Sequence, residues 1–449
     1  MENRNDLTQG VIWKKLIVYF LPIAAGTLFQ QLYNAVDAIV VGKFVGTEAL
    51  AAVGGTPATI SNLLIGFFVA LSGGAGVVIA QHYGAKDYER VSKEVHTSMT
   101  FCFLVGVVLS AAVISFAPPI LRFLKTPADT MTDAVRYTRI YFTGCIFMLL
   151  FNMASGILRA LGESKKPFYY LMVSCALNIG LDLYFVIGLK MGVAGVAWAT
   201  VIAQAVSSVL TLLDLLRAKG EYRLQIRKLG INGRILGSML RIGIPAGLQS
   251  AMYAVSNMIL QTAVNTLGTV VVASWAMSGK VDGVYWAVAG AFGTAVMNFV
   301  GQNFGAGRLD RVKECTKTGM IIFTGITAVL SGLLLLLAKP LLTVFTDDPA
   351  VIETTWEIIT YFVPFYLTWT VIEIFSGVLR GVGDAVKPVI ILALGVCVLR
   401  VVWVLTVYQI WHTLMIVSIC YPISWAVTDV ALLTYYFKGS IFAKKKRRE

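Results

Sequence analysis

Two aspartates stand inside apolar stretches of the first half of the chain. Asp37 follows the run KKLIVYFLPIAAGTLFQQLYNAV, and Asp182 lies within KPFYYLMVSCALNIGLDLYFVIGL. A carboxylate at the centre of a membrane helix costs about 2.5–3.5 kcal/mol on insertion scales, so such a residue usually faces a cavity or a partner. Two carboxyl groups close together in a medium of low dielectric constant resist ionising together and favour a shared proton. Their oxygens also suit Na⁺, and the residues themselves leave both ions open.

Polar residues near these acids extend the candidate site. Asn178 and Asp182 are four residues apart, which places them on one face of a helix. Thr200 and Gln204 repeat this spacing on the next apolar stretch. Pro22 removes a backbone hydrogen bond from the stretch that carries Asp37, so we expect a bend there. The alternative is that both acids only hydrogen-bond to neighbours and hold helices together.

The composition indicates a membrane protein with many spans. Apolar residues make up 57% of the chain, charged residues only 14%, and the mean hydropathy is +0.76. The six cysteines lie in or beside apolar runs and the three histidines are scattered, so neither a disulfide framework nor a metal centre is predicted. The net charge of +13 is better explained by basic loops on one side of a membrane than by nucleic-acid binding. We expect no cofactor.

Twelve apolar stretches are long enough to span a bilayer. They lie at about 14–41, 49–80, 93–117, 134–160, 167–189, 192–217, 236–265, 269–301, 314–338, 354–378, 388–411 and 413–437. Lys and Arg concentrate at the two termini and in the even-numbered loops, which predicts that both termini are cytoplasmic. The basic tail Lys444–Arg448 is expected to lie against anionic lipid.

Two separated motifs occur twice at one offset. QHYGAKDYERV begins at Gln81 and QNFGAGRLDRV at Gln302, while GILRALGESKKP begins at Gly156 and GVLRGVGDAVKP at Gly377, so both pairs are 221 residues apart. This indicates an internal duplication with six spans in each copy. Six is even, so the copies enter the membrane from the same side, as in parallel-repeat transporters. We predict an N-terminal lobe at 1–216, a cytoplasmic linker at 217–235 and a C-terminal lobe at 236–449.

The second copy lacks the acidic set of the first. At the repeat offset, Asn178 and Asp182 correspond to Leu399 and Trp403. Charged residues appear elsewhere in its apolar runs, namely Lys280, Asp282, Glu373 and Arg400. Mutual pairing would let these charges enter a bilayer. The alternative is a second polar site for substrate, which would include Tyr253 and other aromatic residues suited to flat organic cations.

These patterns together resemble a known family. The arrangement is P-x₁₄-D from Pro22 to Asp37, N-x₃-D ending at Asp182, Thr200 eighteen residues later, and doubled Q-x-[YF]-G-A and G-x-L-R-x-x-G motifs. It resembles the MATE (multidrug and toxic compound extrusion) antiporters of the MOP superfamily, from Lys14 to about Phe437. The N-terminal set is similar to the DinF branch. The acids that the NorM branch has in its seventh and tenth helices are missing, since the nearest positions here are Tyr253 and Trp369.

The resemblance implies an all-α fold and a transport function. It implies twelve transmembrane helices in two six-helix lobes that form a V. It also implies a cation-coupling network of Asp37, Asn178, Asp182 and Thr200, with Pro22 as the bend of the first helix. It also implies efflux of small cationic amphiphiles against H⁺ or Na⁺, by a monomer in a prokaryotic cytoplasmic membrane.

Other functions remain in view. A lipid-linked precursor flippase of the same superfamily would use a cationic cavity, which Lys280 and Arg400 could supply. An embedded enzyme would need a reactive cluster that the motifs do not contain, and a passive channel would need a filter-like loop. We therefore expect a transporter and not an enzyme.

Overall fold

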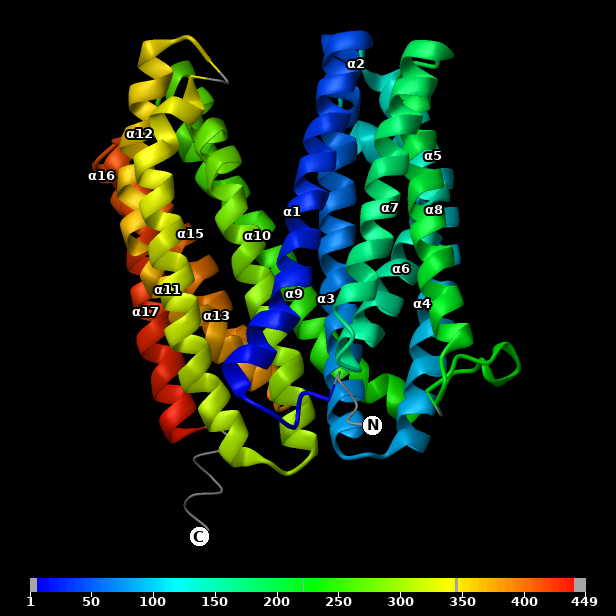
Figure 1. Ribbon diagram of the computed structural model, residues 1–449. Helices are drawn as coiled ribbons and strands as arrows, with labels where there is room; N and C mark the ends of the chain where they lie inside the picture. Colours follow the sequence, from blue (N-terminus) through cyan, green and yellow to red (C-terminus); the bar gives the residue numbers. More distant parts are fainter. Residues whose placement is uncertain (1–5, 221, 344–345, 440–449) are drawn as a thin grey trace. The chain divides into compact units, whose positions relative to one another are not determined.

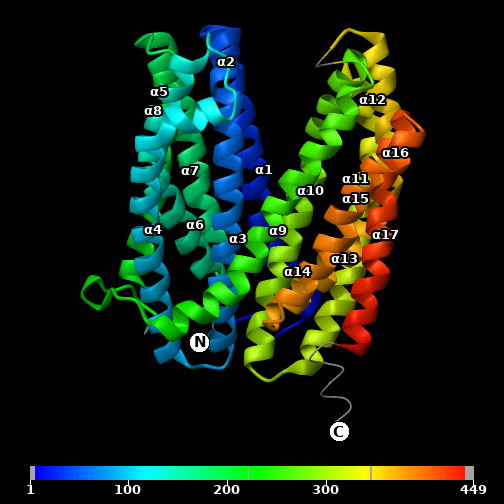
Figure 2. The ribbon, with the colours of Figure 1, turned by 180° about the vertical axis from the view of Figure 1, so that it is seen from behind.

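The computed structural model describes residues 6–220, 222–343 and 346–439. All regular elements in these residues are helices, as the sequence predicts (Figures 1 and 2). The basic tail Lys444–Arg448 lies outside the described residues.

Six helical stretches make up the first copy of the repeat. They are α1 (Ile12–Phe44), α2 (Thr47–Gly54) with α3 (Thr56–Gly84), α4 (Tyr88–Phe123), α5 (Met131–Thr143) with α6 (Cys145–Ala160), α7 (Lys165–Asp182) with the π-helix η1 (Leu183–Gly188), and α8 (Val193–Arg217). The chain bends by 45° between α5 and α6, beside Gly144. A Cβ at Gly144 would lie 2.9 Å from Val201 Cγ2, so only glycine allows this close approach to α8.

Six further stretches make up the second copy, after a segment that contains the short 3₁₀-helix η2 (Ile226–Lys228). They are α9 (Gly233–Asn265), α10 (Thr269–Gly305), α11 (Leu309–Leu342), α12 (Pro349–Phe362) with the 3₁₀-helix η3 (Val363–Phe365) and α13 (Tyr366–Gly381), α14 (Val386–Leu392) with the π-helix η4 (Ala393–Val398), α15 (Leu399–Leu405) and α16 (Val407–Ile410), and α17 (Leu414–Lys438). Each of the twelve predicted spans therefore corresponds to a helical stretch. By length and hydropathy, ten of these stretches could cross a membrane, or eleven if the bent α5–α6 pair is one span.

The duplication extends to the ends of the helices. Both ends of α6 and α13, and both ends of α8 and α17, are 221 residues apart. Within the first copy, α6 packs against α3, α4 and α8. Within the second, α13 packs in the same way against α10, α11 and α17 (Figure 2). The same sequence register therefore builds the same local scaffold twice.

The chain divides into two compact units. The N-terminal unit is built chiefly from Tyr19–Gly247, and the C-terminal unit from Thr8–Val18 with the residues from Leu248 onward. The first part of α1 thus belongs to the C-terminal unit, and the first part of α9 belongs to the N-terminal unit. The changes fall close to the helix prolines Pro22 and Pro245. The lobe and linker boundaries predicted from the sequence stay a prediction.

The repeated loop motif holds one of these exchanged segments. Arg308 Nη1 donates to the carbonyl of Thr8 (2.8 Å), and Arg311 Nη1 donates to the carbonyl of Gly10 (3.0 Å). Arg311 Nε also donates to Asn303 Oδ1 (3.0 Å), within the motif itself. These contacts give the arginines of the motif a structural role in fixing the start of α1.

Candidate functional site

The two acids predicted from the sequence come together in the N-terminal unit. Asp37 lies on α1 and Asp182 is the last residue of α7. Their carboxyl groups lie within hydrogen-bonding reach of each other. Asp182 is fully buried, whereas Asp37 is half-buried. Two helices separated by more than a hundred residues therefore deliver one carboxyl pair.

The backbone beside Asp182 departs from a regular α-helix. The π-helix η1 begins at the next residue, Leu183. Such wide turns inside helices often occur at functional sites, because they rotate the side chains on either side. Asn178, one turn before Asp182, is also buried. The N-x₃-D spacing thus places an amide and a carboxyl on one buried face.

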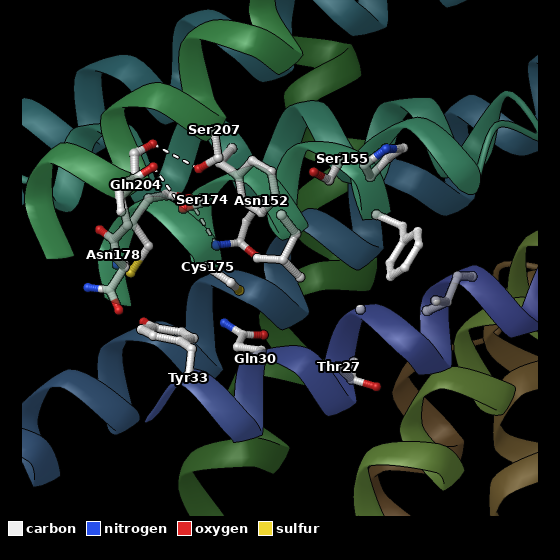
Figure 3. Close-up of a pocket in the computed structure, with 18 of the residues that line it drawn as sticks. Thr27, Gln30, Tyr33, Asn152, Ser155, Ser174, Cys175, Asn178, Gln204 and Ser207 are labelled. Carbon is white, nitrogen blue, oxygen red and sulfur yellow. Dashed lines mark hydrogen bonds between the residues drawn. The ribbon is translucent and has the colours of Figure 1, made fainter. Parts of the chain in front are cut away.

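A small cavity of about 110 Å³, lined by many polar side chains, adjoins this pair at Asn178. Three of the predicted residues line it, namely Pro22, Asn178 and Thr200. Tyr33, one turn before Asp37, lines it as well. Figure 3 shows the polar side chains that surround the cavity, which come from α1, α6, α7 and α8: Thr27, Gln30, Tyr33, Asn152, Ser155, Ser174, Asn178, Gln204 and Ser207.

Apart from the approach of the two carboxyl groups to each other, several buried polar atoms at this site have no hydrogen-bond partner within the described residues. They are Asp37 Oδ1, both carboxyl oxygens of Asp182 and both amide atoms of Asn178. An unsatisfied buried polar group costs about 1–3 kcal/mol. The Thr200 hydroxyl donates to the carbonyl of Val196 (3.1 Å), which leaves its oxygen able to accept. Carboxyl, amide and hydroxyl oxygens are suitable partners for a proton or for Na⁺.

Two tyrosines beside the acids were missed in the sequence. Tyr137 and Tyr141 of α5 stack with ring centroids 5.6 Å apart, and Tyr141 hydrogen-bonds to Gln204. Both tyrosines lie near Asp37. Their four-residue spacing in the fourth span was the available signal, because it places both rings on one helix face.

The C-terminal unit contains a larger cavity of about 450 Å³. Three of the predicted residues line it, namely Tyr253, Asp282 and Arg400. Glu373 adjoins it through Trp369, whereas Lys280 is exposed and does not line it. Most of the remaining wall is aromatic: Trp275, Trp286, Phe362, Tyr366, Trp369, Tyr421 and Trp425.

Two acids of this unit, Asp282 and Glu373, accept hydrogen bonds from aromatic donors. Asp282 Oδ2 accepts from Trp286 Nε1 (3.3 Å) and from the Tyr366 hydroxyl (3.1 Å). Glu373 Oε2 accepts from Trp369 Nε1 (3.1 Å). Ring N–H and O–H groups therefore bind one oxygen of each carboxylate, and mutual pairing of the charged residues stays a prediction.

Arg400 is held in a similar way. Its Nε donates to Ser424 Oγ (2.9 Å), and its guanidinium lies 3.9 Å from the centroid of the Tyr421 ring. The sequence interpretation missed Tyr421 and Trp425 as partners. The repeat offset could have identified them, because they correspond to Thr200 and Gln204.

Comparison with known proteins identifies the family. The MatE family model matches residues 22–184 and again residues 245–406. The probable multidrug resistance protein YoeA of Bacillus subtilis (strain 168) is 30% identical over 436 residues, which cover 95% of this chain and 93% of YoeA. The multidrug export protein MepA of Staphylococcus aureus (strain NCTC 8325 / PS 47) is 22% identical over 415 residues, 91% of this chain and 92% of MepA.

Solved structures show the same fold. The crystal structure of MATE in complex with MaL6 has a TM-score of 0.92 and 21% sequence identity, and the match covers 99% of this chain and 100% of that chain. The predicted twelve-helix fold is confirmed by this likeness, and the internal duplication by the two matches to one family model. The chain therefore belongs to the MatE family, the MATE transporters that its sequence resembles, and is a multi-pass membrane transporter rather than an enzyme.

Proposed function

We propose that this protein is a secondary active exporter of amphiphilic, cationic organic compounds, which exchanges them for an inward-moving H⁺ or Na⁺. The names of YoeA and MepA, a probable multidrug resistance protein and a multidrug export protein, support export of organic compounds. The observation that carries the ion coupling is the buried Asp37–Asp182 carboxyl pair.

The carboxyl pair supports an exchange mechanism. A proton or Na⁺ from outside neutralises the pair, which removes an uncompensated buried charge. Coupling requires that the cation and the exported compound favour different conformations. Asn178 and Thr200 line the adjoining cavity, so a change of charge at the pair alters the environment of that cavity.

Pro22 links the pair to a conformational change. It lies in the interior of α1, one helix with Asp37, and it also lines the cavity. The missing backbone hydrogen bond makes this position the natural bend of α1. In the proposed cycle, neutralisation of the pair changes the bend of α1, the compound leaves, and the lobes of the predicted V move to expose the other side.

The proposal includes a location. The concentration of Lys and Arg at the termini and in the even-numbered loops supports cytoplasmic termini in a prokaryotic cytoplasmic membrane. We expect a monomer, with the tail Lys444–Arg448 against anionic lipid. Fluorescence of a C-terminal green fluorescent protein fusion tests the orientation, because that protein folds in the cytoplasm and not when exported unfolded.

Transport into everted membrane vesicles tests the coupling. The vesicle lumen corresponds to the outside of the cell, so an acidic lumen or a Na⁺-rich lumen, imposed separately, identifies the ion that drives ethidium uptake. Asp37→Asn should abolish uptake under either gradient while the protein still reaches the membrane. Asp310→Asn, on the exposed first turn of α11, is the matched control and should behave as the parent. Normal uptake and proton exchange in Asp37→Asn would remove the N-terminal site from the mechanism.

One observation keeps a second candidate function. Arg400 is buried in the wall of the C-terminal cavity, where a cation suits an anionic headgroup. This favours a flippase for a lipid-linked precursor as the alternative. Liposomes that contain a labelled lipid-linked precursor separate the two functions. A flippase moves the label between leaflets, and it does so without ethidium and without the H⁺ or Na⁺ gradient that drives ethidium transport.

A further inference from the structure

Arg400 is a buried cation that forms no ion pair with a carboxylate within the described residues. Only 5% of the residue is exposed. It is the second residue of α15, immediately after the π-helix η4. A buried charge normally requires an opposite charge or several hydrogen bonds. The fold supplies two aromatic rings, Tyr421 and Trp425, and the Ser424 hydroxyl instead.

The contacts of Arg400 orient its guanidinium. Tyr421 covers one face at 3.9 Å, and Ser424 takes the Nε hydrogen at 2.9 Å. No hydrogen bond to either Nη group is found within the described residues, and Arg400 lines the cavity, so these groups are available to a bound molecule. These groups form the edge that binds carboxylates through two parallel hydrogen bonds. The fixed plane reduces the conformational freedom that is lost when an anion binds.

The rest of the cavity suits a flat aromatic body. The centroid of the Trp286 ring lies 5.0 Å from that of Trp369 and 6.1 Å from that of Trp425. The ring planes are inclined by 85° in the first pair and by 62° in the second. The volume of about 450 Å³ is that of a pocket for a small organic molecule. Asp282 lies in the same wall, with Oδ2 already bonded to Trp286 and Tyr366.

We infer that the C-terminal cavity binds an aromatic carboxylate, with its carboxylate on the Nη groups of Arg400 and its ring among Trp286, Trp369 and Trp425. A cationic group elsewhere on the same compound would face Asp282, so zwitterions also fit. The inference goes beyond the proposed function, on which it rests for the assignment of this cavity to exported compounds, and it adds aromatic acids and zwitterions to the cations named there.

Three probes with one ring system test this preference. The purified protein is titrated without any ion gradient with 9-anthracenecarboxylate, its methyl ester and 9-anthracenemethylammonium, and energy transfer from tryptophan to anthracene reports binding. The parent should bind the carboxylate more tightly than the ester or the ammonium. An ammonium that binds the parent more tightly than the carboxylate overturns the inference, whatever the variants do.

Two substitutions assign the preference to Arg400. Arg400→Gln should weaken the carboxylate about 10- to 100-fold, as expected for loss of a hydrogen bond to a charged group, and should change the ester far less. Retained ester binding shows that the variant is folded. Tyr421→Thr, which introduces the residue of the other copy, should weaken all three probes. Arg241→Gln, at an exposed position of α9, is the matched control and should bind like the parent. Equal carboxylate affinity in the parent and in Arg400→Gln overturns the inference.

The outcome is separable from that of the proposed function. Asp37→Asn should keep the parent's order of affinity among the three probes, because Asp37 lies in the other unit and neutralisation of the acid pair acts on all three probes alike. If the cavity prefers the ammonium while Asp37→Asn still abolishes transport, the inference fails and the ion-coupled exporter stands. If the carboxylate preference holds while Asp37→Asn transports normally, the cavity assignment stands and the coupling site fails.

Discussion

The two copies of the repeat place opposite chemistry at the same register. In the N-terminal unit, Thr200 and Gln204 of α8 line a cavity of about 110 Å³ beside an acid pair. In the C-terminal unit, the corresponding Tyr421 and Trp425 of α17 line a cavity of about 450 Å³ with a buried arginine. The helices that carry these pairs start and end 221 residues apart. The scaffold is duplicated, whereas the cavity is not.

This difference leads us to propose a division of labour between the copies. Small oxygen-bearing side chains around two carboxyls suit a proton or Na⁺, and large rings around a guanidinium suit an organic molecule. A π-helix adjoins the charged residue in each unit, η1 after Asp182 and η4 before Arg400. The comparison predicts that substitutions in the first unit act on ion coupling and that substitutions in the second act on binding of the organic compound.

The largest effect is expected when the first unit receives a residue of the second. Asn178→Leu introduces the residue found at the corresponding position, Leu399, and keeps both acids. It removes a buried amide that lines the cavity one helical turn before Asp182. Loss of a group that hydrogen-bonds to the ligands of an ion typically lowers affinity or activity about 10- to 100-fold. We therefore expect compound-driven proton or Na⁺ exchange in proteoliposomes to fall by that factor.

A matched change elsewhere provides the control for this prediction. Asn265→Leu alters an exposed asparagine at the end of α9, and exchange should stay at the parent level. Binding of the anthracene probes should be unchanged in both variants, because neither residue lines the C-terminal cavity. Undiminished exchange in Asn178→Leu would mean that the amide does not serve the acid pair.

A smaller effect is expected at the helix prolines. Proline costs about 3 kcal/mol in a helix interior, so Pro22→Ala favours a straight α1 by up to that amount. We expect export to slow about tenfold if roughly half of this energy acts on the conformational step. Pro245→Ala makes the same change in α9, but Pro245 does not line the C-terminal cavity and its helix carries no counterpart of Asp37.

Turnover measured for both variants under one gradient distinguishes these positions. A larger loss for Pro22→Ala assigns the coupled bend to α1. Equal losses would show that α1 and α9 both act as hinges, and a larger loss for Pro245→Ala would contradict the proposed cycle.

Much of the scaffold follows from the sequence because its signals are local. Each apolar stretch is a helix, since a backbone inside a bilayer must satisfy its own hydrogen bonds. The acid pair could be predicted for a related reason. Asp37 and Asp182 are costly in apolar surroundings, so each needs the other or another partner. The N-x₃-D spacing also fixed the face that Asn178 shares with Asp182.

Other features depend on contacts that no local pattern specifies. Asp282 and Glu373 bind indole and phenol donors, although an opposite charge is the simpler expectation from composition. The stacking of Arg400 on Tyr421 joins two helices whose facing sides are set by packing. The exchange of the first parts of α1 and α9 between the units follows from tertiary contacts alone.

The smallest effect is expected at Gly74, where the two copies differ by one carbon atom. A Cβ on Gly74 of α3 would lie 2.5 Å from the backbone nitrogen of Gly243 in α9, whereas the corresponding residue of α10 is a buried alanine, Ala295. Backbone cannot move aside as a side chain can, so Gly74→Ala should destabilise the protein by about 1–3 kcal/mol, the usual cost of overpacking. Ala295→Gly should cost about 0.5–1 kcal/mol through helix propensity. Thermal unfolding in detergent measures both, and a Gly74→Ala protein as stable as the parent would show that α3 and the first part of α9 are not in close backbone contact. That result would also remove the physical reason for assigning the first part of α9 to the N-terminal unit, because the glycine pair is what lets these two helices approach.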